Sequence, residues 1–307
     1  MKSKVIVILG PTATGKSDIS VQIAKKFSAQ GGSALGGNGA EIISADSRQV
    51  YKGMDLGSGK ITKKEMMGIP HRLLDIISPK TFFSVVKYKK LAEKEIKKII
   101  AKNKIPIICG GTGFYIDSIV KNITLPEVKL NRKLRQKLEK YSAEKLYEIL
   151  KKLSPTRAKN IDKHNKVRLI RAIEIAKTLG NIPKIKESPN KYNFLLIGLD
   201  TTDKILKERI HIRLFARIRA GMINEVKRLH KQKISWKRLE SFGLEYRQTA
   251  LYLQNKITKA QMIENLKNNI WHFVKRQRTW FKRDKNIKWF EPKQITPIIK
   301  SVKNFIK

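Results

Sequence analysis

Residues 10–17 read Gly10-Pro11-Thr12-Ala13-Thr14-Gly15-Lys16-Ser17, which fits the pattern G-x-x-x-x-G-K-[ST] at every fixed position. The apolar run Val5 to Leu9 in front of it has the length of a strand. Asp18 to Phe27 behind it carries apolar residues at helical spacing. A strand, a glycine-rich loop and a helix in this order predict a phosphate-binding loop, or P-loop, rather than a structural turn.

The expected task of the P-loop is to hold a diphosphate. Its glycines let successive backbone amides turn toward the phosphates, the helix N-terminus adds positive potential, and Lys16 adds a point charge. Ser17 supplies a hydroxyl that can ligate Mg²⁺. Such loops also bind nucleotides such as ATP in kinases and NTPases, so the motif alone does not name a reaction.

Three further apolar runs of strand length are Glu41 to Ser44, Leu73 to Ile77 and Ile105 to Cys109. The last is preceded by an amphipathic helical pattern from about Val85 to Lys102. Strands separated by helices predict an α/β fold, with a P-loop NTPase-like parallel sheet flanked by helices.

The texture changes between residues 125 and 192, where Lys, Glu and Leu recur at helical spacing, and a strand pattern returns at Phe194 to Leu199. We therefore expect an inserted small helical domain at 125–192. Residues 1–124 and 193–307 are expected to form the core domain with a basic helical C-terminal part. Ser28 to Gly39 is rich in Gly, Ser and Ala without periodicity, which indicates a surface insertion.

The chain has 67 Lys and Arg against 25 Asp and Glu, a net charge of +42 over 307 residues. Such a charge is self-repelling unless a polyanion neutralises part of it, and nucleic acid is the first candidate. Lysine enrichment from a biased genome is the alternative. The single cysteine, Cys109, excludes an internal disulfide, and no apolar run approaches membrane-spanning length. A cytoplasmic protein without a membrane partner is expected.

Two polar groups follow predicted strands, at the sheet edge where folds of this class bind ligands. Asp46 stands two residues beyond the run that ends at Ser44. It is either a catalytic or Mg²⁺-binding carboxylate or the cap of a turn. Gly110 to Gly113, with the hydroxyl of Thr112, is either a second part of the site or a tight turn.

A segment that interleaves cations with aromatic rings runs from Trp271 to Asp284. This composition suits phosphate contact and base stacking, and Lys275, Arg276 and Arg283 are the preferred RNA contacts. The alternative is an amphipathic helix that packs its rings on the core and exposes its charges, and both interpretations can hold at once.

Six motifs together make a family resemblance specific. In chain order they read GPTATGKS, SADSRQVYKGMDLGSGK, PHRLLDI, GGTGFY, VRLIRAIEI and KRQRTWFKRD. In all six the chain resembles the tRNA dimethylallyltransferases, over nearly its whole length except Ser28 to Gly39 and the extreme C-terminus. The resemblance implies transfer of a dimethylallyl group from dimethylallyl diphosphate to the exocyclic amine of the adenosine adjacent to the anticodon.

The resemblance also implies roles for individual residues. The residue matching Asp46 looks like the general base on the adenine amine, and Thr112 resembles a hydroxyl that assists near the amine and the diphosphate. The P-loop resembles the diphosphate cradle, with Mg²⁺ at Ser17. Two segments resemble those that touch the tRNA: Asp46, Ser47, Arg48 and Gln49, and Val167, Arg168, Leu169, Ile170 and Arg171.

One motif departs from the family pattern. Where the family usually has a compact Gly-Tyr-Arg or Gly-Tyr-Lys, this chain reads Phe242-Gly243-Leu244-Glu245-Tyr246-Arg247-Gln248, with two residues between Gly and Tyr. Arg247 is the expected match for the family's phosphate and tRNA contact, and it joins Asp46 and Thr112 as a candidate catalytic residue.

The implied chemistry accounts for these residue types. The adenine amine is a poor nucleophile, so a carboxylate that accepts its proton raises its reactivity, while cations and Mg²⁺ stabilise the departing diphosphate. The target base must leave the anticodon stem-loop of the tRNA, which predicts a channel into the enzyme. We expect the enzyme to be a monomer. The rival functions are a small-molecule kinase that binds ATP, with Asp46 or Asp75 as its Mg²⁺ ligand, and a noncatalytic RNA binder.

Overall fold

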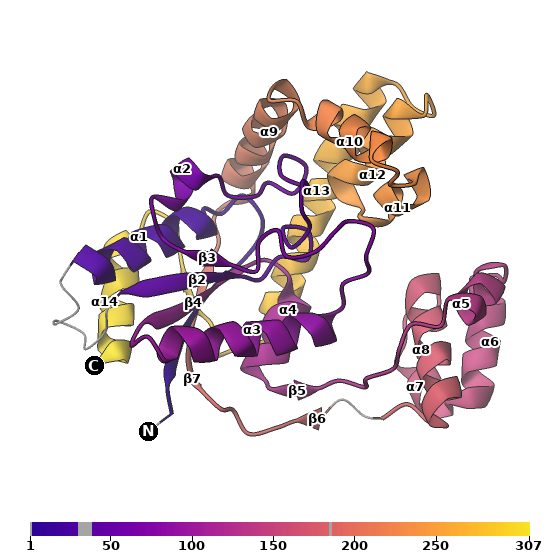
Figure 1. Cartoon of the computed structure of the whole chain (residues 1–307), viewed down its shortest axis with the longest axis horizontal. Coiled ribbons are helices and arrows are strands. Elements are labelled where there is room, and N and C mark those ends of the chain that lie inside the picture. The colour runs from indigo at the N-terminus through magenta and orange to yellow at the C-terminus, as the bar shows by residue number, and fades with distance from the viewer. Residues whose placement is uncertain (1, 30–38, 184–185) are drawn as a thin grey trace. The chain divides into compact units, whose positions relative to one another are not determined.

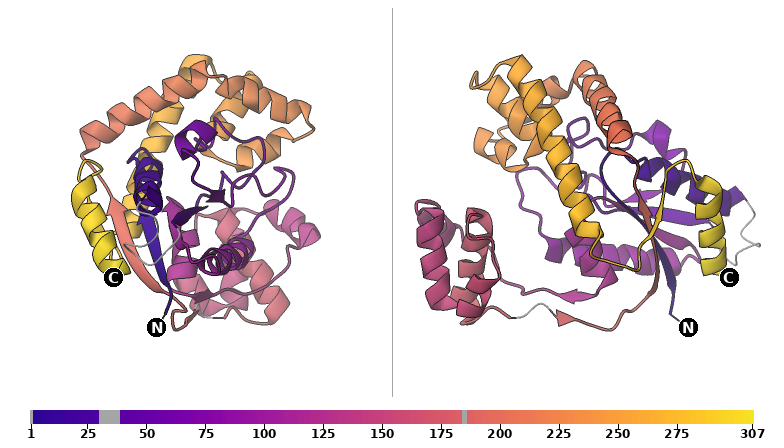
Figure 2. Two further views of the ribbon diagram at one scale, coloured as in Figure 1. Left: turned by 60° about the vertical axis from the view of Figure 1, so that its left-hand side comes forward. Right: turned by 180° about the vertical axis from the view of Figure 1, so that it is seen from behind.

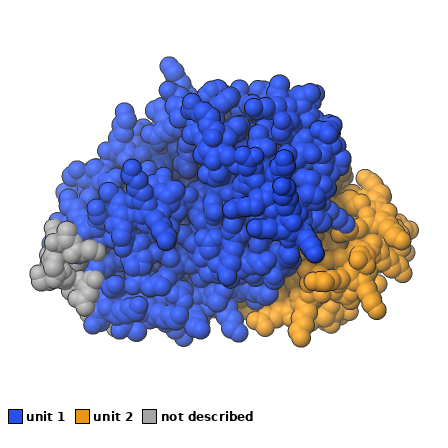
Figure 3. Space-filling view, turned by 45° about the horizontal axis from the view of Figure 1, so that its top comes forward, with its two compact units in different colours: residues 1–122, 189–307 blue, residues 123–188 orange. Residues whose placement is uncertain are grey.

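The computed structural model describes residues 2–29, 39–183 and 186–307. Residues 30–38, most of the predicted surface insertion, lie outside these ranges. The chain divides into two compact units (Figure 3): a core unit of Met1–Asn122 and Pro189–Lys307, and a helical unit of Ile123–Ser188, where the sequence predicts an insertion at 125–192.

A parallel sheet forms the centre of the core unit. Its order in the described residues is β3-β2-β4-β1-β7-β8, which confirms the predicted α/β fold. β1 pairs with β4 on one side and β7 on the other, so that Ile6 lies opposite Ile107 and Leu195. The strands are β1 Lys4–Leu9, β2 Ala40–Ser44, β3 His71–Arg72, β4 Ile105–Gly110, β7 Asn193–Leu199 and β8 Lys288–Phe290.

Helices cover both faces of this sheet. Alternate side chains of β1 point to opposite faces and therefore enter two different hydrophobic cores. One face is covered by α3 (Val85–Ile100) and α4 (Gly113–Val120), and the other by α1 (Lys16–Ala29) and α14 (Ile295–Ile306) (Figure 1). The carboxyl ends of β1, β2, β4 and β7 meet at one edge, so the loops that follow these strands converge there.

The remaining helices of the core unit gather beyond that edge (Figures 1 and 2). α13 is the long helix of this group, and it contacts both α4 and α9. The chain therefore returns to the sheet edge along α13 after an excursion through four shorter helices. The bounds are α2 Lys63–Met66, α9 Asp203–Arg219, α10 Met222–Lys231, α11 Trp236–Ser241, α12 Leu244–Leu253 and α13 Lys259–Phe281.

One predicted strand is wrong in its position. The run Leu73 to Ile77 does not form a strand, and the sheet instead takes the two preceding residues as β3, with a single bridge from Ile77 to Tyr51. Leu73 and Asp75 have φ angles of 63° and 53°. A side chain in this left-handed region cannot continue a pleated strand, so the apolar run folds as a loop.

The helical unit has its own core, built from Leu138, Leu146, Leu150, Leu169 and Ile173. Its elements are β5 Ile123–Thr124, α5 Arg132–Glu139, α6 Ala143–Leu153, α7 Pro155–Lys159, α8 Lys166–Leu179 and β6 Lys186–Glu187.

A buried carboxylate, Glu174 of α8, ties this helix to α5 and to the N-cap residue of α5. It accepts hydrogen bonds from the Asn131 amide at 2.7 Å and from Arg135 Nη2 at 2.8 Å, and it pairs with Arg171. Burial by itself raises the pKa of Glu174, but the bonds from Arg135, Asn131 and Arg171 outweigh it and hold that pKa below the usual value.

Within the described ranges, no helix combines the length and the apolar character that a membrane span requires.

Candidate active site

The P-loop joins β1 to α1 in the conformation that its glycines permit. Gly10 and Gly15 have φ angles of 139° and 82°, and a Cβ at Gly10 would lie 2.2 Å from the carbonyl oxygen of Leu199. Lys16 Nζ donates to the carbonyl of Pro11 at 2.5 Å, as Thr14 Oγ1 does at 2.9 Å. The loop is therefore closed on itself, with its lysine held at the loop rather than extended into solvent.

Lys16 lies in an environment short of negative charge. The pKa of Lys16 is lowered to about 8, chiefly because the side chain is buried; the cation of Arg213 also lowers it, and Cys109, Asp46 and Asp200 act against this lowering. A phosphate group placed beside Lys16 would supply the missing counter-charge. β1 and β2 both pair with β4 in parallel, so the loops that follow them, which lead to Lys16 and Asp46, leave the same edge of the sheet.

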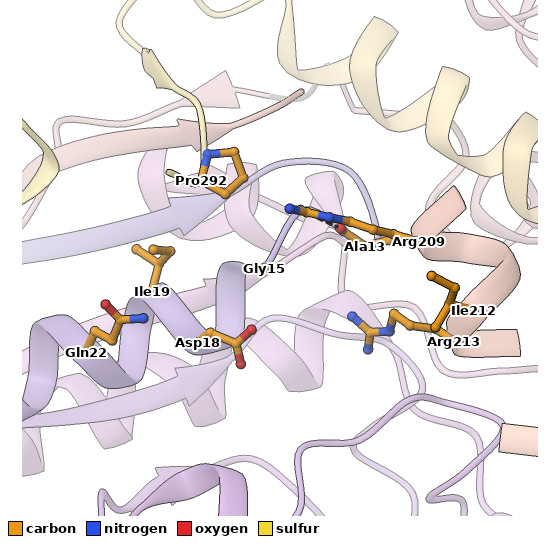
Figure 4. A pocket seen from close by; sticks show the side chains of 9 residues that line it. All are labelled: Ala13, Gly15, Asp18, Ile19, Gln22, Arg209, Ile212, Arg213 and Pro292. Atoms are coloured by element: carbon orange, nitrogen blue, oxygen red, sulfur yellow. Dashed lines mark hydrogen bonds between the residues drawn. The ribbon is translucent and has the colours of Figure 1, made fainter. Parts of the chain in front are cut away.

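A cavity of about 340 Å³ lies beside the P-loop, and Figure 4 shows its lining. Arg209 and Arg213 extend from α9 toward the loop and the first turn of α1, and Arg209 Nη1 donates to the carbonyl of Ala13 at 3.5 Å. No sequence motif points to these two arginines. Their four-residue spacing puts them on one face of a helix, but only the fold shows that this face meets the P-loop.

Asp46 follows β2 and both caps a turn and presents a carboxylate. Its Oδ1 accepts hydrogen bonds from the backbone amides of Arg48 at 2.7 Å and Gln49 at 3.3 Å. Within the described chain, its Oδ2 has no hydrogen-bond partner. The two interpretations of Asp46 are thus compatible, because one oxygen orients the side chain and the other remains able to accept a proton.

Thr112 connects the loop after β4 to the loop after β2. Its Oγ1 accepts a hydrogen bond from the Ser47 amide at 3.1 Å, and its own amide donates to the carbonyl of Ala45 at 3.1 Å. A Cβ at Gly110 would lie 2.3 Å from that same carbonyl oxygen. The glycine cluster therefore allows close approach of two loops, and it brings Thr112 next to Asp46.

Two of the arginines expected to contact substrate, Arg48 and Arg247, have partners within the protein. Arg48 Nε donates to the carbonyl of Phe242 at 2.6 Å. Arg247 lies exposed on α12, where its Nε donates to the carbonyl of Glu240 at 3.2 Å. No hydrogen bond or ion pair between described residues joins Arg247 to the P-loop, whereas Arg209 makes such a contact.

The predicted contact segment on α8 is only partly accessible. Val167 and Arg168 are exposed, whereas Leu169 and Ile170 are buried in the core of the helical unit and Arg171 is bound to Glu174. The side chains of Leu169 and Ile170 therefore serve packing, which corrects their assignment to RNA contact.

The basic aromatic segment, most of which lies on α13, has exposed cations on one side and a buried apolar side on the other. Lys275, Arg276 and Arg283 are exposed, and the Arg283 guanidinium lies 5.7 Å from the ring centroid of Trp280. Arg278 is instead bound to Asp200 through Nε at 2.9 Å and Nη2 at 2.9 Å. The apolar side of the same helix is buried through Met262, Leu266, Ile270, Val274 and Phe281.

A magnesium site made by protein side chains alone is not found: the described ranges hold no cluster of three or more His, Cys, Asp or Glu that could bind a metal ion. Ser17 is exposed on the first turn of α1. Mg²⁺ in phosphate sites commonly takes few protein ligands and completes its shell with phosphate oxygens and water. The Ser17 hydroxyl therefore fits an ion that arrives with a diphosphate.

Comparison with known proteins gives a consistent result. Residues 49–284 match the family model described as IPP transferase. The chain is 40% identical to the tRNA dimethylallyltransferase of Anoxybacillus flavithermus, covering 95% of this chain and 91% of the relative. It is 42% identical to tRNA dimethylallyltransferase 2 of Treponema denticola, covering 92% of each.

Solved structures agree with the sequence relatives. The tRNA isopentenylpyrophosphate transferase of Bacillus halodurans superposes with a TM-score of 0.73 at 35% identity, covering 99% of this chain and 97% of that one. A eukaryotic dimethylallyltransferase solved while acting on tRNA gives a TM-score of 0.75 at 25% identity, covering 94% of this chain and 74% of that one.

Proposed function

The chain belongs to the IPP transferase family, and we propose that it transfers a dimethylallyl group from dimethylallyl diphosphate to tRNA. The acceptor is the exocyclic amine of the adenosine adjacent to the anticodon, and diphosphate is released. The observation that supports this proposal is that the loops after β1, β2 and β4 leave one edge of the sheet, where the Thr112 hydroxyl accepts the amide of Ser47, the neighbour of Asp46. A proton acceptor and a leaving-group site thus belong to one centre.

The P-loop side of the centre stabilises the leaving group. The bond between the allylic carbon and the diphosphate oxygen breaks, and negative charge gathers on that oxygen. Lys16, the P-loop amides and the arginines of the adjacent cavity, Arg209 and Arg213, supply the opposing charge. Mg²⁺ held by Ser17 and the diphosphate oxygens would add to this stabilisation when bound.

The Asp46 side of the centre activates the nucleophile. As the amine nitrogen forms its bond to the allylic carbon, it loses a proton, and Asp46 Oδ2 is the atom placed to take it. The turn that binds Asp46 Oδ1 keeps the carboxylate oriented. The Thr112 hydroxyl accepts from Ser47 and still has its own proton to donate toward the amine or the diphosphate.

The tRNA side is proposed from exposed cations. Lys275 and Arg276 on α13, Arg283 just after it and Arg168 on α8 are available for phosphates of the anticodon stem-loop. We assign RNA contact also to the 46–49 loop, where Ser47 and Gln49 flank a guanidinium already bound to protein. The enzyme is proposed to act as a monomer in the cytoplasm. Sedimentation of the pure protein would test whether it is a monomer.

The deciding experiment incubates unmodified tRNA with dimethylallyl diphosphate, or with ATP as the alternative donor, and analyses the tRNA nucleosides by mass spectrometry. The Asp46→Asn variant should lose about 10²- to 10⁴-fold in single-turnover rate, because it cannot accept the proton, while it still binds tRNA. Glu264→Gln removes an exposed carboxylate on α13 and is the matched control, expected to keep full activity. Unimpaired turnover by Asp46→Asn would contradict the assignment of the base. Label that appears only in phosphorylated small molecules would favour a kinase.

A further inference from the structure

Gln277 occupies an unusual position for an amide side chain. It lies on the buried side of α13 with 5% of its surface exposed, and both ends of its amide are bonded to backbone. Its Oε1 accepts a hydrogen bond from the Thr12 amide at 2.9 Å, and its Nε2 donates to the carbonyl of Gly111 at 2.8 Å. One side chain therefore connects the P-loop to the glycine-rich loop that carries Thr112.

The glycines of that loop show how closely α13 is applied to it. A Cβ at Gly111 would lie 2.3 Å from Gln277 Nε2, and a Cβ at Gly113 would lie 2.3 Å from Trp280 Cδ1. Trp280 Nε1 in turn donates to Asp117 of α4 at 3.0 Å. The loop can sit against α13 only because these positions lack side chains, so the contact with Gln277 is a close fit of two surfaces.

The bridge completes a link across the proposed centre that consists of three hydrogen bonds and the short stretches of backbone between them. From the P-loop it runs through Gln277 to Gly111, and the neighbouring Thr112 takes the amide of Ser47, which adjoins Asp46. The Thr12 amide is committed to Gln277 instead of to a phosphate. This amide therefore does not donate to a phosphate; instead, its bond to Gln277 fixes the position of the diphosphate cradle relative to the other side of the site.

We propose that Gln277 is a positioning residue that sets the separation between the diphosphate cradle and the loops bearing Asp46 and Thr112. In terms of the proposed function, on which this inference rests, that separation places the allylic carbon before the adenine amine. A displacement of about 1 Å between reacting groups can cost on the order of 100-fold in rate, so such a residue acts mainly on the chemical step.

The role requires a donor and an acceptor on one side chain of this length. Gln277→Glu keeps the acceptor for Thr12 but sets a second carboxylate oxygen against the Gly111 carbonyl, where two acceptors repel. A protonated Glu restores the donor and reproduces both bonds. Gln277→Met keeps the length and removes both bonds at every pH, so the two variants differ in one testable property.

The experiment measures single-turnover prenylation of tRNA by wild type and both variants from pH 5 to pH 8. At pH 8 each variant should be about 100-fold slower, with little change in the affinity for dimethylallyl diphosphate measured without tRNA. The ratio of the Gln277→Glu rate to the wild-type rate should rise toward one as the pH falls, because the new carboxyl becomes protonated. The ratio for Gln277→Met should stay low. Taking ratios removes the pH dependence that all three proteins share.

Asn268→Asp adds a negative charge to the exposed side of the same helix and serves as the control, expected to show no acid recovery. The proposal is overturned if Gln277→Met turns over like wild type, or if the Gln277→Glu ratio does not change with pH. Hydrogen exchange supplies a readout that does not depend on turnover: the Thr12 amide should exchange slowly in wild type and rapidly in Gln277→Met. If wild type does not prenylate tRNA at all, the proposed function fails, whereas fast exchange of the wild-type Thr12 amide overturns the bridge itself.

Discussion

Replacing Glu225 with Gln should release the loop that contains Asp55, Leu56 and Gly57. In α10, the buried Glu225 carboxylate accepts the amides of Asp55 at 2.8 Å and Leu56 at 2.7 Å on Oε2. Its Oε1 accepts the amide of Gly57 at 3.0 Å and the Tyr246 hydroxyl at 2.9 Å. Successive amides that point at one carboxylate give the loop its shape, in the way that backbone amides elsewhere enclose an anion.

The expected magnitude follows from the bonds that a glutamine cannot make. Gln keeps one carbonyl oxygen, so two of the donors face an NH₂ group, and the bonds that remain lose their charge assistance. Each hydrogen bond to a charged group contributes about 1.5–3 kcal/mol, so losing two predicts a destabilisation of about 3–6 kcal/mol. Opening of this loop alone should become easier by on the order of 2 kcal/mol, which raises amide exchange about 30-fold.

Hydrogen exchange resolved to residues 55–57 is the appropriate assay, because a chain of two compact units does not guarantee a single unfolding transition. Tyr246→Phe is the control: it removes one donor to Oε1 and should cost about 1 kcal/mol, while the amides on Oε2 stay protected. Equal exchange rates for these amides in wild type and Glu225→Gln would refute the reasoning.

Gly113→Ala should destabilise the protein by about 1–3 kcal/mol, since the new Cβ would overlap Trp280; an unchanged thermal midpoint would argue against the tight packing seen here. The affinity for dimethylallyl diphosphate should fall as the pH rises through the Lys16 pKa of about 8, because the diphosphate binds the charged lysine, and calorimetry at pH 7 and pH 9 tests this. The loss should approach about tenfold for each pH unit above that pKa, and a flat profile would show that Lys16 does not contact the ligand. Arg278→Lys should lower the free energy of unfolding in urea by about 1–2 kcal/mol, because a lysine cannot reproduce the two parallel bonds to Asp200. An unchanged free energy of unfolding would show that these two bonds do not stabilise the fold.

Much of the core unit could be predicted because its signals are local. The apolar run before Gly10 and the helical spacing after Lys16 lie within a few turns of each other, so their order specified a strand, a loop and a helix. The strand predicted for Leu73 to Ile77 was wrong, since the composition of this run suits a strand while its backbone turns through two left-handed residues. Composition reports how apolar a segment is, and it does not report the φ angles that tertiary packing imposes.

The candidate site divides along the same line. Lys16, Asp46 and Thr112 stand directly after strands of one parallel sheet, and such residues must share an edge whatever the details of packing. Arg209, Arg213 and Gln277 stand on helices that follow much later in the chain, and no spacing in the sequence says which loop a helix will cover. In the sequence they are two arginines one helical turn apart and a glutamine between cations, and such patterns occur on many helices that have no part in a site.

From its residues alone this chain specifies a phosphate-binding loop, a parallel sheet and an excess of positive charge, because each depends on neighbours in the sequence or on composition. The meeting of Gln277 with Thr12, across 265 positions of the chain, depends on how α13 packs against the sheet edge. That packing is the sum of many weak contacts between distant segments, and those contacts exist only once the chain has folded.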